Sequence, residues 1–295
     1  VTPVLNSQEE IQSFLPTVEA NFLLTNQRIL KNVAGSQNWQ TLMDGNLKGM
    51  KADANAIVAW DTNTVFYGEQ LQNSIALPEG NSGSIADVMP VNGTYKVLAV
   101  FAHSHGVEFT VNVYEGKQNL SFINSGNYNF LTVPSVKWAS EDTYVVNYTT
   151  PTAVSGWTTF YRVPVQGPHV QALQLNGAYR TLTGSNGQLW GVTFGYSYLP
   201  AYSEQINLFT VNLSNASSQE YEWYHHHDGY YYGAPETRGV KYLPNAIART
   251  PANSFLCVGS FDSALGTSIR SYNIATNAFT SIQGPANVDL KGIHA

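Results

Sequence analysis

The chain has 295 residues, of which 13 % are aromatic and only 12 % are charged, and its formal net charge is −6. Average soluble proteins have about 25 % charged residues, and coiled coils or other long-helix proteins draw about half of their residues from Ala, Glu, Lys, Leu and Arg, so this composition excludes that class. The 43 % of hydrophobic residues argue against a disordered chain. The negative charge disfavours nucleic acid as a partner, which needs a basic surface, and no apolar run is long enough to span a membrane.

One pattern recurs six times along the chain: a short strand, a tight turn containing Asn, Asp or Gly, and a strongly apolar strand. The apolar segments, in chain order, are residues 22–24, 56–60, 95–100, 143–146, 189–192 and 255–258. Turn residues that tolerate a positive φ, between segments of β-forming residues, are typical of β-hairpins. The pattern therefore predicts an all-β protein.

Further strands follow most of these hairpins. Alternating segments come next at residues 109–114, 160–163, 208–211 and 269–274, and weaker segments follow at 121–123, 171–175 and 279–282. Four strands in each of six repeats give about 49 residues per repeat (295/6), which is the size of a propeller blade. We therefore expect a six-bladed β-propeller with four-stranded blades, and we expect residues 1–295 to form this single domain.

The two ends of the chain predict how the ring closes. Residues 289–293 (Asp-Leu-Lys-Gly-Ile) match residues 46–50 (Asn-Leu-Lys-Gly-Met), a predicted innermost strand, and no partner strand follows them. A blade that pairs N-terminal and C-terminal strands removes exposed sheet edges, so we expect residues 289–295 to complete the first blade. Residues 13–19 are the alternative innermost strand of that blade.

Half of the cationic residues fall on the predicted innermost strands. Aligning these strands on Met50, Val88, Val136, Leu182, Val240 and Ile293 groups seven of the 14 Lys and Arg residues together with one histidine: Lys48, Lys51, Lys137, Arg180, Arg238, Lys241, Lys291 and His294. Like charges that converge at one mouth of a central channel repel one another, so the pattern predicts a site for a carboxylate, phosphate or sulfate. The alternative is that these side chains face solvent or pair with acids such as Asp53, Asp87, Asp289 and Glu236.

Aromatic residues predict a second part of the binding surface. Residues 221–233 are rich in Tyr, Trp and His but also polar and broken by Gly, so we expect them to link two blades rather than to form core. Exposed Tyr and Trp side chains suit stacking against sugars or contact with a protein. The candidates are Tyr198, Tyr202, Trp223, Tyr230, Tyr231 and Tyr232. Packing between blades is the alternative role for these rings.

Histidines give weak candidates for a metal site. A His-x-His pair on a strand can aim both imidazoles in one direction, and two such pairs occur, His103 with His105 and His225 with His227. Because the pairs belong to blades that are not neighbours, we expect solvated or structural histidines, with no metal and no cofactor. Cys257 is the only cysteine, so no internal disulfide forms, and its apolar neighbours predict a buried thiol.

The composition also indicates where the protein works. A chain poor in Lys and rich in Tyr, Asn, Ser and Thr is typical of secreted proteins, so we expect an extracellular location. Asn-x-Ser/Thr sequons for N-glycosylation occur, but about as often as chance would place them in such a chain.

The six-repeat pattern resembles six-bladed propellers of the gluconolactonase and regucalcin type and fungal propellers such as the Malassezia allergen. In these lactonases an early Glu in a Gly-Glu-Gly-Pro-like strand, with Asn and Asp, holds a divalent ion near the axis. The corresponding strand starts here are Lys48-Gly49, Arg238-Gly239 and Lys291-Gly292, without Glu, so the resemblance implies the fold and neither the metal site nor a catalytic residue. The six-bladed fungal fucose lectins are similar in size, but their regular Arg/Glu/Trp sugar site in each blade is not apparent.

These observations favour a protein that binds a small anionic ligand or an acidic glycan at the cationic residues, because no acid–base constellation stands out. One alternative is a lyase or hydrolase for acidic sugars, in which Lys and Arg would stabilise an enolate and Tyr or His would act as base. Another alternative is an adhesion or protein-interaction module that uses the aromatic segments alone.

Overall fold

The computed structural model describes residues 5–54, 56–79, 83–103, 108–129, 134–149, 156–185, 187–197, 203–229, 235–239, 242–250, 254–261 and 267–282. Regular secondary structure over these residues is β-strand, without helix. This part of the chain accordingly offers no helix that could cross a membrane.

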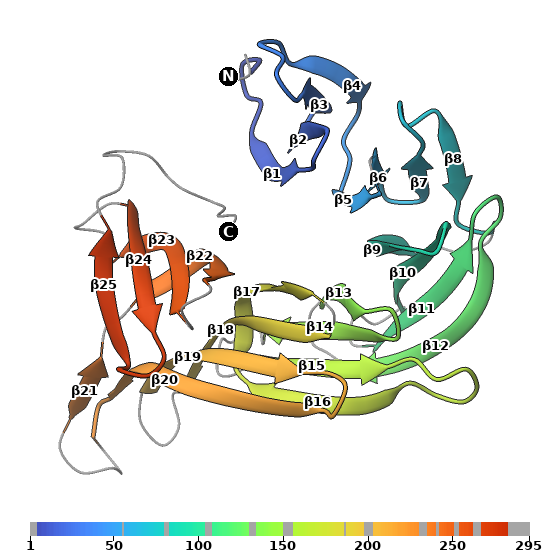
Figure 1. Cartoon of the computed structure of the whole chain (residues 1–295). Helices are drawn as coiled ribbons and strands as arrows, with labels where there is room; N and C mark the ends of the chain where they lie inside the picture. Colours follow the sequence, from blue (N-terminus) through green and yellow to red (C-terminus); the bar gives the residue numbers. More distant parts are fainter. Residues whose placement is uncertain are drawn as a thin grey trace. The chain divides into compact units, whose positions relative to one another are not determined.

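The described strands group into six sheets, and in each of them strands that follow one another in sequence lie side by side (Figure 1). Five sheets have four strands and one has five. Six antiparallel meanders of this size are the blades of a six-bladed β-propeller, which confirms the predicted fold class.

The chain divides into two compact units. The first comprises residues 1–129, 136–141 and 163–169, and the second comprises residues 130–135, 142–162 and 170–295. Buried hydrophobic clusters lie within each unit. The expectation that residues 1–295 form one domain stays a prediction.

The first unit contains three complete sheets. The first sheet consists of β1 (Ile11–Pro16), β2 (Ala20–Thr25), β3 (Arg28–Val33) and β4 (Gln40–Asp44). The second consists of β5 (Gly49–Asp53), β6 (Ala56–Trp60), β7 (Thr64–Tyr67) and β8 (Asn73–Ala76). The third consists of β9 (Ser84–Val91), β10 (Thr94–Ala102), β11 (Glu108–Gly116) and β12 (Ser121–Asn129).

Turn chemistry explains the hairpin between β9 and β10. Asn92 and Gly93 have φ angles of 48° and 78°, the left-handed region that a two-residue type I′ turn requires at both central positions. Val91 and Thr94 face each other across this turn, so the Asn-Gly pair sets the register of the hairpin as far as Leu98, after which the register shifts.

The first sheet bears on ring closure. β1 pairs with β2, with Phe14 opposite Leu23, so N-terminal residues alone provide four strands for this sheet. β1 covers residues 13–16 of the alternative innermost strand. Residues 289–295 lie outside the described residues, so closure by a C-terminal strand stays a prediction.

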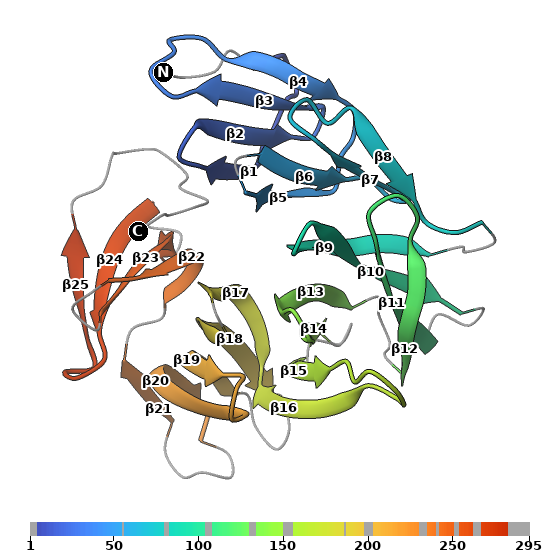
Figure 2. The ribbon, with the colours of Figure 1, turned by 45° about the vertical axis from the view of Figure 1, so that its right-hand side comes forward.

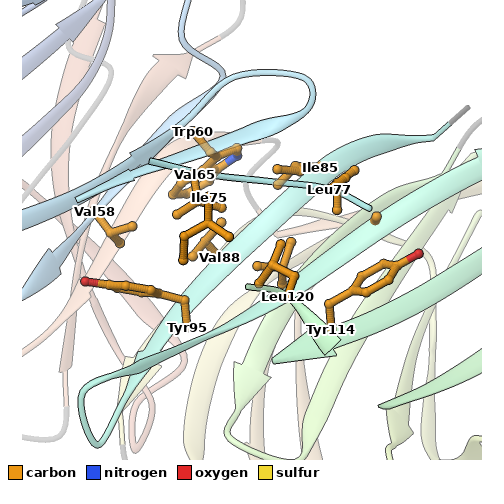
Figure 3. Packing of buried hydrophobic residues seen from close by; sticks show 12 residues of the cluster. Val58, Trp60, Val65, Ile75, Leu77, Ile85, Val88, Tyr95, Tyr114 and Leu120 are labelled. Atoms are coloured by element: carbon orange, nitrogen blue, oxygen red, sulfur yellow. The ribbon is translucent and has the colours of Figure 1, made fainter. Parts of the chain in front are cut away.

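Side chains of the second and third sheets form one of the cores of the first unit (Figure 3). On β10, Tyr95, Val97 and Ala99 share one face, because a strand turns every second side chain to the same side, and all three belong to this cluster. Leu98 and Val100 between and after them are buried as well. Val58 and Val65, on β6 and β7, pack in the same cluster.

The fourth, fifth and sixth sheets make up most of the second unit. The fourth sheet consists of β13 (Ser135–Ser140), β14 (Thr143–Thr149), β15 (Gly156–Arg162) and β16 (Val170–Asn176), and β13 from Val136 onward belongs to the first unit. The fifth consists of β17 (Ala178–Ser185), β18 (Gln188–Ser197), β19 (Ser203–Asn212), β20 (Ser217–His227) and β21 (Glu236–Gly239). The sixth consists of β22 (Tyr242–Arg249), β23 (Ser254–Phe261), β24 (Thr267–Asn273) and β25 (Ala278–Ile282).

The prediction that Arg238 stands on an innermost strand is wrong. Arg238 lies on β21, an extra strand that pairs with β20 at the end of the five-stranded sheet (Figure 2). The first strand of the sixth sheet is β22, on which Ile247 and Ala248 are buried. The alignment failed because Arg-Gly before an apolar residue suits an edge strand as well as a first strand.

Cys257 on β23 is buried, with no exposed surface, and desolvation raises the pKa of its thiol to about 12. Because only the thiolate reacts, we expect a thiol reagent at pH 8 to leave the native protein unlabelled and to label one site in denaturant. Mass spectrometry counts the added groups. Fast labelling of the folded protein would contradict the burial of this thiol.

Candidate functional site

Asp87 on β9 connects neighbouring first strands within the first unit. Its carboxylate oxygen Oδ2 lies 2.6 Å from Lys51 Nζ of β5 and accepts a hydrogen bond of 2.7 Å from the backbone N–H of Trp138 on β13. The other oxygen accepts from the backbone N–H of Val88. Asp87 is only 3 % exposed, so its buried carboxylate joins three sheets, through the ion pair with Lys51 and the hydrogen bond from Trp138. Lys51 is therefore paired with an acid, which was the alternative interpretation of the cationic residues.

The other two candidate cations of the first unit differ from Lys51. Lys48, just before β5, and Lys137, on β13, are exposed, and no ion pair joins either to a carboxylate of the described residues. Asp53 is engaged elsewhere, because it accepts a hydrogen bond of 2.8 Å from the Tyr95 hydroxyl. Burial, together with this bond, raises the pKa of Tyr95.

In the second unit both described candidate cations, Arg238 and Arg180, are exposed, but only one of them is ion-paired. Arg238 forms a two-pronged ion pair with Glu236, two residues away on the same strand, and lowers the pKa of that carboxyl to about 2. Arg180 on β17 is exposed and has no ion pair within the described part of the chain. Lys241, Lys291, His294 and Asp289 lie outside the described residues.

The expectation that Trp223 is an exposed aromatic residue in a link between blades is wrong. Residues 221–227 belong to β20, and Trp223 is 3 % exposed and packs edge-on against Tyr272 and Phe279. The register of β19 and β20 shifts between Ile206 and Asn207, which makes Trp223 the extra residue of a β-bulge. This bulge breaks the two-residue alternation, so the sequence pattern reads as irregular. Tyr198, Tyr202 and Tyr230–Tyr232 lie outside the described residues.

The histidine candidates form local polar contacts. His103 Nε2 lies 2.6 Å from the Thr110 hydroxyl, and His105 is not among the described residues. The rings of His225 and His227 are 5.6 Å apart and nearly perpendicular, and their nitrogens lie near Glu222 and Glu236 respectively. Within the described ranges, no group of three or more His, Cys, Asp or Glu side chains is arranged to hold a metal ion.

The second unit contains a pocket that the sequence did not predict. Its volume is about 330 Å³, and β18, β19, β20 and the end of β22 contribute its walls. Trp190 and Arg249 lie on it, with the Arg249 guanidinium carbon 5.7 Å from the centre of the Trp190 ring. The polar side chains at the ends of β18, β19 and β20 are visible in the sequence. The sequence did not show that they lie together, because this depends on the register of the strands.

No protein-family model and no curated protein sequence matches the chain. Among solved structures, the chain is similar to the extracellular domain of a one component system from B. thetaiotaomicron, with a TM-score of 0.52 and 13 % identity. That match covers 99 % of this chain and 37 % of the other. The extracellular domain of a hybrid two component system from B. thetaiotaomicron gives a TM-score of 0.53 at 12 % identity, with the same coverage.

The CNH domain of AfRom2 is similar over 94 % of this chain and 86 % of its own length, with a TM-score of 0.50 and 13 % identity. At such identities the similarity shows a shared fold and leaves the function open, because one fold carries many functions.

Proposed function

We propose that this propeller is a binding protein whose exposed first-strand cations hold a small anionic ligand or an acidic glycan. The observation that carries the proposal is that Lys48 and Lys137, both in the first unit, are exposed and have no ion pair with a described carboxylate. Cations without a carboxylate partner create a positive local potential, which attracts an anion from solution.

Asp87 supports this proposal within the first unit. It is the buried counter-charge of Lys51 and also binds the backbone of Trp138, the residue after Lys137. A carboxylate held in this way fixes the positions of both strands, while its charge offsets only one cation. Lys48 and Lys137 thus remain available to an anion from solution.

The test compares the affinity of the double variant Lys48→Gln/Lys137→Gln with that of the native protein. Calorimetric titration with sulfate, and with a short oligogalacturonate, at low ionic strength measures the dissociation constant. We expect the double variant to weaken binding about thirtyfold or more, since it loses two charge-assisted contacts, each worth about 1 kcal/mol or more. Added salt should weaken binding by the native protein and narrow this difference.

Lys117→Gln is the matched control because Lys117 is also exposed in the first unit but lies in the turn between β11 and β12. This variant removes one positive charge, half of what the double variant removes, and should bind as the native protein does. Equal affinity of the double variant and the native protein would refute the proposal.

The remaining features of this proposal rest on composition. We place the protein outside the cell on its secretory type of composition, and the similarity to an extracellular domain is compatible with that location. Tyr198, Tyr202 and Tyr230–Tyr232 stay further candidate ligand contacts, and a protein partner is the alternative use of these rings.

A further inference from the structure

The core-facing positions of β18, β19 and β20 change from apolar to polar along the strands. Val192, Leu208 and Tyr221 are opposite one another and belong to or pack against the core of the second unit. Two residues along each strand, the opposed set is Trp190, Thr210 and Gln219, and two further along it is Gln188, Asn212 and Ser217. Because side chains two apart share a face, these polar rows continue the core surface.

The polar rows line the pocket of about 330 Å³, which is within the size range of small-ligand sites. Arg249 at the end of β22 contributes its guanidinium, placed over the Trp190 ring. A pocket therefore occupies the place where core packing would otherwise continue. Amide and hydroxyl groups, one aromatic ring and one cation lie together on it.

Local hydrogen bonds leave donors available on this surface. The Gln219 side-chain oxygen accepts a 2.7 Å bond from the Tyr221 hydroxyl, and the Asn212 side-chain oxygen accepts from both the backbone and the hydroxyl of Ser214. Each of these bonds uses the amide oxygen. The two NH₂ groups have no acceptor among the described residues and can donate to a ligand.

We propose that this pocket binds a sugar acid, a small polyhydroxylated molecule with one carboxylate. Among the described residues that line it, Arg249 is the only charged one, and its guanidinium can bind a single carboxylate through two parallel hydrogen bonds. The amides of Gln188, Asn212 and Gln219 suit hydroxyl groups, which both donate and accept. This inference rests on residues other than those of the proposed anion site.

The experiment titrates ¹⁵N-labelled protein with glucuronate and follows the indole NMR signal of Trp190. Glucose and the methyl ester of glucuronate are the matched probes, because each lacks the negative charge. We expect glucuronate to shift the Trp190 signal and to bind at least tenfold more tightly than either neutral probe, as charge-assisted hydrogen bonds imply. Arg249→Gln should remove this preference, and Gln188→Ala should weaken the binding of all three probes.

Lys117→Gln controls for the change of net charge and should bind glucuronate as the native protein does. The inference is overturned if Arg249→Gln keeps the preference for glucuronate, or if saturating glucuronate leaves the Trp190 signal in place. The Lys48→Gln/Lys137→Gln variant separates the two proposals, because it should lose sulfate binding and keep the Trp190 response.

Discussion

Replacing Glu9 with glutamine is expected to lower the free energy of unfolding by about 2–4 kcal/mol, because it breaks a buried bidentate ion pair. The Glu9 side chain has no exposed surface and accepts hydrogen bonds of 2.8 and 2.9 Å from Arg28. It also accepts from the Thr25 hydroxyl and the Asn6 backbone. Urea denaturation at pH 7 measures the loss, and a change below about 0.5 kcal/mol would contradict this role.

Acid should reveal the same interaction. The Arg28 guanidinium, more than any other group, lowers the pKa of Glu9 from 4.5 to about 2. In the unfolded chain the carboxyl takes up its proton near its ordinary pKa, so the stabilisation is complete above pH 4.5 and is lost as the pH falls towards 2. The native protein and Glu9→Gln should therefore converge in stability over this range.

Glu10→Gln is the control for both measurements. Glu10 is adjacent in sequence and exposed, and its hydrogen bonds with Asn26 use its backbone N–H and carbonyl rather than its side chain. This variant should unfold at nearly the same urea concentration as the native protein. A shared loss in both variants would point to general charge effects rather than to the ion pair.

Replacing Asp87 with alanine is expected to cost about 2–4 kcal/mol of unfolding free energy. The substitution leaves the buried backbone N–H of Trp138 without its acceptor and Lys51 without its counter-charge. The Lys51 side chain is 35 % exposed and can turn towards water, so the unsatisfied amide accounts for much of the loss. Glu69→Ala, which removes an exposed acid of the first unit, should change stability by less than about 0.5 kcal/mol.

A double-mutant cycle isolates the ion pair from the rest of this effect. Lys51→Met should destabilise the native protein more than it destabilises Asp87→Ala, because the pair is already broken in the second background. We expect a coupling energy of about 1 kcal/mol, since the pair is partly solvated. Strictly additive losses would show that Lys51 and Asp87 do not interact in solution.

The fold was accessible from the sequence because its signals are local. The Asn92-Gly93 turn and the apolar segment of residues 95–100 specify a hairpin and a buried strand over about ten residues. Six such repeats of blade length are enough to predict a six-bladed propeller. Trp223 was misassigned because a bulge, which depends on pairing with β19, interrupts the alternation.

The candidate site was accessible only in part. The sequence identified Asp87 as a possible partner of the cations. The structure shows that Asp87 forms its ion pair with Lys51 and also accepts a hydrogen bond from the backbone N–H of Trp138. Arg238 was aligned with the first strands, although it pairs with Glu236 on an edge strand. Residue type and spacing suggested these groups, but they did not specify which sheet edge each strand would occupy.

By itself, the sequence determined the all-β class, the hairpins and the six-fold repeat, because backbone propensity, turn chemistry and side-chain alternation act between near neighbours in the chain. Only the tertiary structure decided which charges are neutralised and where a pocket forms. Asp87 meets partners 36 and 51 residues away, and the pocket joins strands from residues 188 to 249. Such contacts depend on the register and packing of whole sheets, which no local pattern specifies.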